Sequence, residues 1–74
     1  MISSEQNMSH GTVTWFSASR GLGFIRSDDG DDVYVHSDEV EMTGFRYLDA
    51  GQRVAFDADP TEDGLTARRV RVES

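Results

Sequence analysis

The chain has no cysteine and no lysine, and Pro60 is its single proline. Without cysteine it has neither a disulfide framework nor a thiolate zinc site, so its 74 residues depend on an efficient apolar core for stability. No apolar run approaches the length of a membrane-spanning helix, and residues 1–10 lack the basic start and the apolar stretch of a signal peptide. We therefore expect one small cytoplasmic domain with no membrane partner.

Motifs for catalysis and for metal or cofactor binding are missing as well. Gly21-Leu22-Gly23 begins a dinucleotide-binding pattern, but Arg26 takes the place of the third glycine and no helix is expected to follow. The acidic segment 28–32 lacks the closing glutamate of a calcium loop, and two histidines without cysteine make a poor zinc site. No serine, histidine and aspartate have the context of a catalytic triad. The sequence therefore predicts no enzyme, metal, cofactor or small-molecule substrate.

Positive charge is scarce, because seven arginines are outnumbered by fourteen acids and the net charge is −7. Taken alone, this excess argues against a nucleic-acid ligand, since phosphate contacts dominate the affinity for such ligands. However, no acid lies between Glu5 and Asp28, and this locally cationic segment carries Arg20 and Arg26. The exclusive use of arginine suits stacking on bases and forked phosphate contacts, although genome composition or a salt-rich cytoplasm produces the same bias.

Alternating segments separated by turn residues predict five short strands. They are Thr12 to Phe16, Gly23 to Ser27, Val33 to His36, Arg53 to Asp57 and Leu65 to Val72. Asp29-Gly30 and Asp63-Gly64 are hairpin signals, and Pro60 is expected to end the fourth strand. Residues 37–52 are predicted to form a long loop with one helical turn near residues 38–40.

Three strands before this loop and two after it predict an all-β domain in the form of a small barrel. The core is expected to consist of the inward-facing apolar residues of the strands, together with one valine of the loop. These residues are Val13, Phe16, Ile25, Val33, Val35, Val40, Val54, Phe56, Val70 and Val72.

The same alternation leaves rings on the outside of the barrel. A period of two puts the aliphatic residues of the second and third strands on the inner face and Phe24, Tyr34 and His36 on the outer face. Trp15 is expected outside as well, because its neighbours occupy the inner face of the first strand. Flat rings beside the cation of Arg20 form a surface on which unpaired bases stack, since every base has a π face and every phosphate a charge.

Two segments, Thr14 to Ile25 and Val33 to Ser37, resemble the two ribonucleoprotein-type motifs of the bacterial-type cold-shock domain, at the spacing that the family has. The resemblance continues through the glycines and valines that follow and covers nearly the whole chain. It implies a five-stranded antiparallel OB-fold barrel that binds single-stranded DNA or RNA. We expect the cold-shock domain to span residues 11–74, after a flexible extension formed by residues 1–10.

The resemblance also assigns roles to particular residues. It implies base stacking by aromatic side chains and histidine, apolar contact by Leu22, contacts with the nucleic-acid backbone by two arginines, and contact with base edges by one acid. The stacking residues are Trp15, Phe24, Tyr34, His36 and Phe45, and Leu22 makes the apolar contact. Arg20 and Arg46 contact the nucleic-acid backbone, and Asp32 contacts base edges. Taken alone, His36 is more often structural, and Phe45 also suits a role in pinning its loop.

The chain departs from the family pattern at several of these positions. Thr14 stands where relatives carry lysine, Leu22 and Ser37 stand where they carry phenylalanine, and Asp63 lies in a loop that is often basic. Two stacking rings and two positive charges are therefore missing. Because stacking contributes about 1–3 kcal/mol per base, we expect modest affinity and low specificity, with a preference for pyrimidine-rich or flexible strands.

The function that we predict is that of a cold-shock protein, a monomer that binds single-stranded RNA or DNA and acts as an RNA chaperone or as a regulator of transcription or translation. The alternative is a protein-interaction barrel whose acidic surface contacts a basic partner and whose nucleic-acid site has decayed. Leu22 and Ser37 distinguish the two. If they mark decay, mutation of the remaining rings should have no effect on function.

Overall fold

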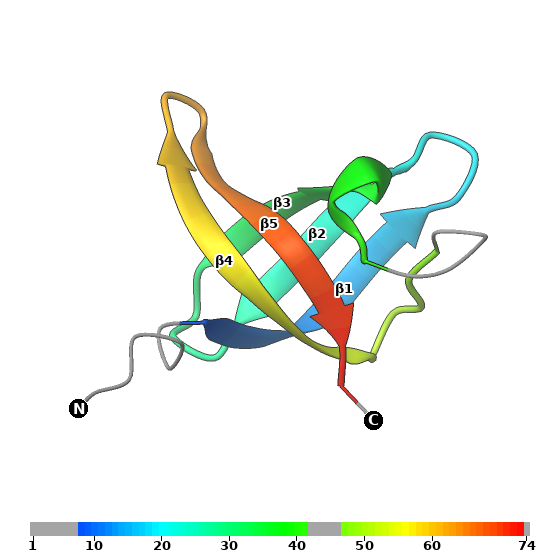
Figure 1. Ribbon diagram of the computed structural model, residues 1–74, viewed down its shortest axis with the longest axis horizontal. Coiled ribbons are helices and arrows are strands. Elements are labelled where there is room, and N and C mark those ends of the chain that lie inside the picture. The colour runs from blue at the N-terminus through cyan, green and yellow to red at the C-terminus, as the bar shows by residue number, and fades with distance from the viewer. Residues whose placement is uncertain (1–7, 42–46, 74) are drawn as a thin grey trace.

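The computed structural model describes residues 8–41 and 47–73, and these fold into a closed barrel of five strands (Figure 1). The strands are β1 (Ser9–Ser17), β2 (Leu22–Ser27), β3 (Asp32–His36), β4 (Arg53–Thr61) and β5 (Gly64–Val72). A short 3-10 helix, η2 (Ser37–Glu39), follows β3, close to the predicted helical turn. The expected all-β barrel with three strands before the loop and two after it is confirmed.

The order of strands around the barrel is β1-β2-β3-β5-β4. Four seams are antiparallel, whereas β3 and β5 pair in parallel. A ring with an odd number of strands cannot alternate in direction at every seam, which accounts for one parallel pair in the antiparallel OB-fold barrel that was expected. The parallel seam brings the β4–β5 hairpin alongside β3, which matters for the site described below.

Pro60 does not end the fourth strand, contrary to expectation. β4 continues to Thr61, and Pro60 lies opposite Leu65 in the register with β5. Proline is tolerated near the end of a strand when its missing N–H is not required by the ladder. The longer β4 makes a hairpin with β5 that projects beyond the rest of the barrel (Figure 1).

The first strand begins earlier than expected. Ser9 pairs with Phe56 and His10 pairs with Ala55, so both residues belong to β1 and not to an N-terminal extension. Residues 1–7 of the expected extension lie outside the described residues.

The core contains eight of the ten residues that the alternation predicts, together with Leu48 and Ala67. Phe16 and Val72 are only partly buried and pack against the core. The ring of Phe16 lies edge-on to Tyr47, with ring centroids 5.8 Å apart. Leu48 comes from a loop without strand periodicity, which is why the sequence pattern did not reveal it. The fully buried residues are Val13, Ile25, Val33, Val35, Val40, Leu48, Val54, Phe56, Ala67 and Val70.

A β-bulge in the first strand sets the direction of Trp15. The register with β2 shifts between Val13 and Trp15, so Thr14 is the extra residue, and its hydroxyl donates a hydrogen bond to the carbonyl oxygen of Phe24 at 3.0 Å. Without the bulge, strict alternation would place Val13 and Trp15 on the same face. The bulge lets Val13 and Phe16 both turn inward while Trp15 remains outside.

We expect Ile25→Ala to lower the free energy of unfolding by about 2–4 kcal/mol, because Ile25 is completely buried and the substitution leaves a cavity. Ile25→Val, which removes one methyl group, should cost only about 0.5–1.5 kcal/mol. Urea denaturation followed by circular dichroism measures both values. Equal stability of Ile25→Ala and the wild type would contradict the assignment of the inner face of β2.

Candidate nucleic-acid interface

Three rings lie side by side on the outside of the barrel, one on each of three adjacent strands. Trp15 on β1 is opposite Phe24 on β2, which in turn is opposite Tyr34 on β3. The ring centroids of Trp15 and Phe24 are 6.4 Å apart with the planes tilted by 30°, and those of Phe24 and Tyr34 are 5.9 Å apart at 70°. We call these three residues the ring row.

The ring row is exposed to a degree that core packing does not explain. Trp15 is 46% exposed and Phe24 is 41% exposed, and they are the exposed large hydrophobic residues of the described part of the chain. Aromatic side chains are more often partly or fully buried, so two exposed rings next to the half-buried Tyr34 indicate a binding surface. The outward direction predicted for Trp15, Phe24 and Tyr34 agrees with this geometry.

A second pair of outward residues, Leu22 and His36, lies next to the ring row. They are opposite each other across the β2–β3 seam, and each is two residues from a ring of the row. His36 Nδ1 accepts a hydrogen bond from the backbone N–H of Asp38 at 3.1 Å, so the imidazole also caps η2. The Nε2 edge of the ring is not used in this contact. His36 is thus both a structural cap and a partly exposed side chain of this surface.

Arg26 and Asp32 border the ring row on the side opposite Leu22 and His36. They are opposite each other in the register, and Arg26 Nε donates to Asp32 Oδ1 at 2.8 Å. The predicted base-contacting residue Asp32 is therefore held in place by an arginine that the sequence reasoning treated only as local charge. The alternation could have placed Arg26 on this face, because it lies two residues after Phe24.

Arg20 lies in the turn between β1 and β2 and is exposed. Its guanidinium makes no ion pair with any residue in 8–41 or 47–73. Phe45 and Arg46, the other predicted contacts, lie outside the described residues.

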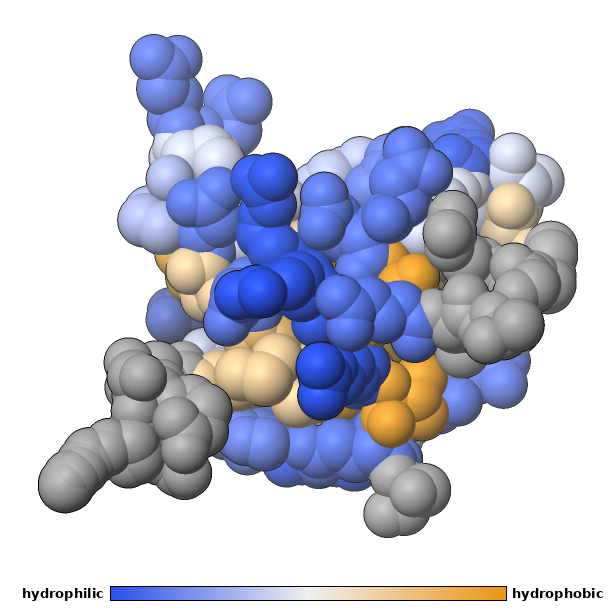
Figure 2. Space-filling view, in the orientation of Figure 1, coloured by the Kyte–Doolittle hydropathy of each residue, from blue (hydrophilic) through white to orange (hydrophobic). Residues whose placement is uncertain are grey.

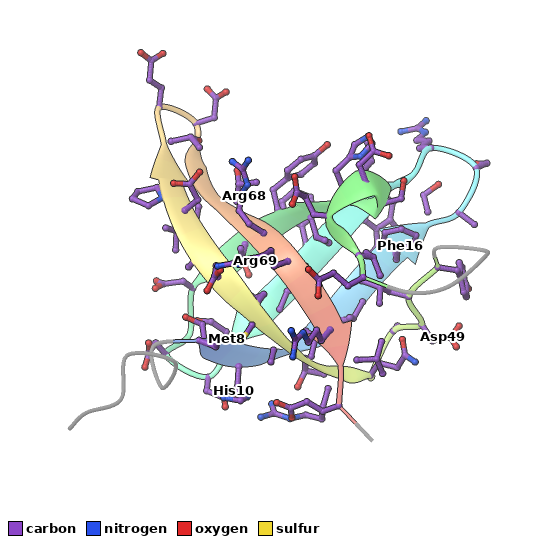
Figure 3. All side chains as sticks on the ribbon, viewed as in Figure 1. Met8, His10, Phe16, Asp49, Arg68 and Arg69 are labelled. Carbon is purple, nitrogen blue, oxygen red and sulfur yellow. The ribbon has the colours of Figure 1, made fainter. Side chains whose placement is uncertain are left out.

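The remaining described arginines are occupied by acids. Arg53 makes two hydrogen bonds of 2.8 and 2.9 Å with Asp28, and this contact holds the pKa of that carboxyl below its ordinary value. Arg68 and Arg69 lie along the hairpin of β4 and β5 (Figure 3). Charged residues cross the middle of the face that β4 and β5 turn toward the viewer, and this face is largely hydrophilic in Figure 2. The pairs are Arg26 with Asp32, Arg53 with Asp28, Arg68 with Asp59, Arg69 with Asp57 and Arg71 with Glu41.

A pocket of about 520 Å³ opens beside the ring row, toward the β4–β5 hairpin. The sequence reasoning did not predict it, because it depends on the parallel β3–β5 seam that places Thr66 opposite Tyr34. Asp63 was recognised only as a departure from the family pattern. The lining residues are Phe24, Tyr34, Thr61, Asp63, Gly64, Leu65 and Thr66.

Ser37, where a phenylalanine was expected from the family pattern, packs under the β1–β2 turn. Its backbone N–H donates to the carbonyl oxygen of Gly21 at 2.8 Å. Gly21 has a φ of 70°, and a Cβ built on it would lie 2.9 Å from the Ser37 hydroxyl oxygen. The Ser37 hydroxyl therefore lies where a side chain at position 21 would collide with it, which suits the glycine at that position.

The described residues contain neither a helix that could span a membrane nor a cluster of metal ligands. None of the helices in this part of the chain is long and apolar enough to cross a membrane. Among the same residues, no group of three or more His, Cys, Asp or Glu side chains is placed to hold a metal ion.

Comparison with known proteins gives a consistent result. The profile of the 'Cold-shock' DNA-binding domain matches residues 9–73. Cold shock protein CspC of Bacillus subtilis is 45% identical over 64 residues, which cover 86% of this chain and 97% of the relative. Cold shock protein 1 of Lactiplantibacillus plantarum is 44% identical over 63 residues, which cover 85% of this chain and 96% of the relative.

A solved structure of Drosophila Unr, containing CSD456, is similar to this barrel with a TM-score of 0.76 and 26% sequence identity. The match covers 92% of this chain and 27% of that longer chain. The profile match spans all five strands of the barrel and includes the three residues of the ring row. The chain therefore belongs to the 'Cold-shock' DNA-binding domain family.

Proposed function

We propose that this protein binds single-stranded RNA or DNA by stacking unpaired bases on the ring row, and that it acts as an RNA chaperone or as a regulator of transcription or translation. The ring row is the observation that carries the proposal. Its centroids are 6.4 and 5.9 Å apart, whereas bases within a helix stack at about 3.4 Å. Bases must therefore separate from one another to stack on successive rings, which favours an unpaired and extended strand.

Stacking supplies most of the affinity in this proposal, because the chain has little free positive charge near the rings. Five of the described arginines are paired with acids, and the net charge is −7. Each stacked base contributes about 1–3 kcal/mol, and the contribution varies little with sequence because every base has a π face. A protein that binds only unpaired strands shifts the pairing equilibrium toward them by mass action, which is the basis of chaperone activity.

The fluorescence of Trp15, the single tryptophan, tests the proposal directly. We expect oligo-dT of seven nucleotides and a uridine-rich RNA of the same length to quench its emission, because the indole stacks on a base. The same oligo-dT annealed to its complement should leave the emission unchanged. If single strands do not quench at high micromolar concentration, the proposal is wrong and an acidic protein-interaction barrel becomes the better explanation.

A further inference from the structure

The pocket beside the ring row has a flat aromatic wall and a polar rim. Phe24 and Tyr34 form the wall, while residues of the β4–β5 turn form the rim. Thr61 fixes the shape of that turn, since its hydroxyl donates to the carbonyl oxygen of Gly64 at 2.8 Å and accepts from the backbone N–H of Asp63 at 3.2 Å. The Thr61 hydroxyl is therefore engaged, and the backbone of Asp63, which also lines the pocket, is held at the rim.

The side chain of Asp63 supplies hydrogen-bond acceptors to this rim and no hydrogen-bond donor. Its carboxylate makes no ion pair with any residue of the described segments, unlike the acids Asp57 and Asp59 of the same hairpin. An ionised carboxylate offers two acceptor oxygens and cannot donate. A ligand that stacks on Phe24 or Tyr34 and reaches Asp63 must therefore present N–H groups at its edge.

Among the bases, guanine fits this requirement best. Its Watson–Crick edge carries the N1–H and the N2 amino group side by side, and two adjacent N–H donors match the two oxygens of a carboxylate, as in an arginine fork. Thymine and uracil present one N–H between two carbonyl oxygens, which a carboxylate repels. Cytosine and adenine present one amino group beside a ring acceptor. Exposed base edges of single strands are read in this way by side-chain hydrogen bonds.

We propose that this pocket is a guanine-preferring subsite and that Asp63 determines the preference. The inference rests on the proposed single-strand binding, because the base reaches the pocket as part of a strand stacked on the ring row. It also modifies the expectation from the sequence, since one position along the strand favours a purine where a preference for pyrimidines was expected.

The test compares two DNA strands of seven nucleotides by Trp15 quenching. One is oligo-dT, and the other is the same strand with guanine in the central position. Because the strand can slide along the rings, one guanine suffices to reach the pocket. We expect the guanine strand to bind about three- to tenfold more tightly, a factor reduced from that of a buried charged hydrogen bond because the rim is exposed. A third strand with hypoxanthine, which lacks the amino group, should bind more weakly than the guanine strand.

Asp63→Asn should remove the preference, so that both strands bind with the same dissociation constant. Glu62→Gln is the matched control, because it removes the same charge from the same turn at a residue that does not line the pocket. This variant should keep the wild-type ratio of the two dissociation constants. Urea denaturation of both variants confirms that each ratio is measured on folded protein.

The possible outcomes distinguish failure of the guanine subsite from failure of the proposed single-strand binding. Quenching by both strands with equal affinity, or a preference that persists in Asp63→Asn, overturns the guanine subsite and leaves single-strand binding intact. Loss of the preference in Glu62→Gln as well would show a general charge effect, and equal binding of guanine and hypoxanthine would show that the two-donor contact is wrong. Absence of quenching by every strand overturns the proposed function itself.

Discussion

Replacing Phe24 or Tyr34 with alanine is expected to weaken single-strand binding by about 1–3 kcal/mol each, or about 5- to 150-fold, while the barrel remains folded. Both side chains point away from the core, and both belong to the ring row on which we propose that bases stack. Truncation removes a stacking platform and leaves no cavity inside the barrel. Trp15 quenching measures the affinity, and urea denaturation measures the stability of each variant.

Val35→Ala provides the opposite pattern, because Val35 follows Tyr34 in β3 and is completely buried. This control should lower the stability of the barrel and leave the affinity of the folded molecules close to that of the wild type. If Phe24→Ala or Tyr34→Ala unfolds the protein, the ring in question is structural. If either variant binds as the wild type does, the strand does not cross the ring row at that point.

The period-two pattern was sufficient to predict the outer face of β2 and β3. Ile25 and Val33 are fully buried while Phe24 is exposed, because strong alternation over a whole strand leaves only one favourable register against the core. The outward direction of Trp15 was also predicted, although the strict pattern fails at this residue. The reason is the bulge at Thr14, which the odd spacing of Val13 and Phe16 implies but does not locate.

The pocket could not be predicted from local patterns, because its two sides are far apart in the sequence. Tyr34 meets Thr66 only after the barrel closes through a parallel seam between β3 and β5. Pro60 was misread for a related reason, since the ladder that tolerates it depends on where β5 pairs. The ion pairs of the arginines are equally non-local: Arg53 and Asp28 are 25 residues apart, and Arg71 and Glu41 are 30 residues apart.

These ion pairs limit the positive charge that this acidic protein can offer to nucleic acid. The acids that hold Arg68 and Arg69 lie on β4, whereas the partner of Arg53 follows β2 and that of Arg71 follows η2. Exposed pairs of this kind contribute little to stability individually, about 0–1 kcal/mol, and salt screens them. Their consequence for binding is larger, because paired arginines are not free to neutralise phosphates. Arg20 is the arginine of the described segments without an ion pair.

Restoring a ring or a charge at this surface should strengthen binding in two distinguishable ways. Leu22→Phe adds a ring beside His36 on the outer face, and we expect it to tighten single-strand binding by about three- to tenfold, since leucine already supplies part of the apolar contact. Thr14→Lys adds a cation at the exposed bulge beside Trp15, at the loss of one solvent-exposed hydrogen bond.

The two variants should differ in their response to salt, because counterion release accompanies a new phosphate contact and does not accompany stacking. Thr14→Lys should steepen the slope of log affinity against log salt concentration by about 0.7, the value for one phosphate contact on a single strand. Leu22→Phe should leave the slope unchanged while it raises the affinity at every salt concentration. Equal slopes for both variants would contradict this division between rings and charges. If the wild type binds but neither variant binds more tightly, the strand follows another path across the barrel, and the roles of Leu22, Thr14 and Trp15 must be reassigned.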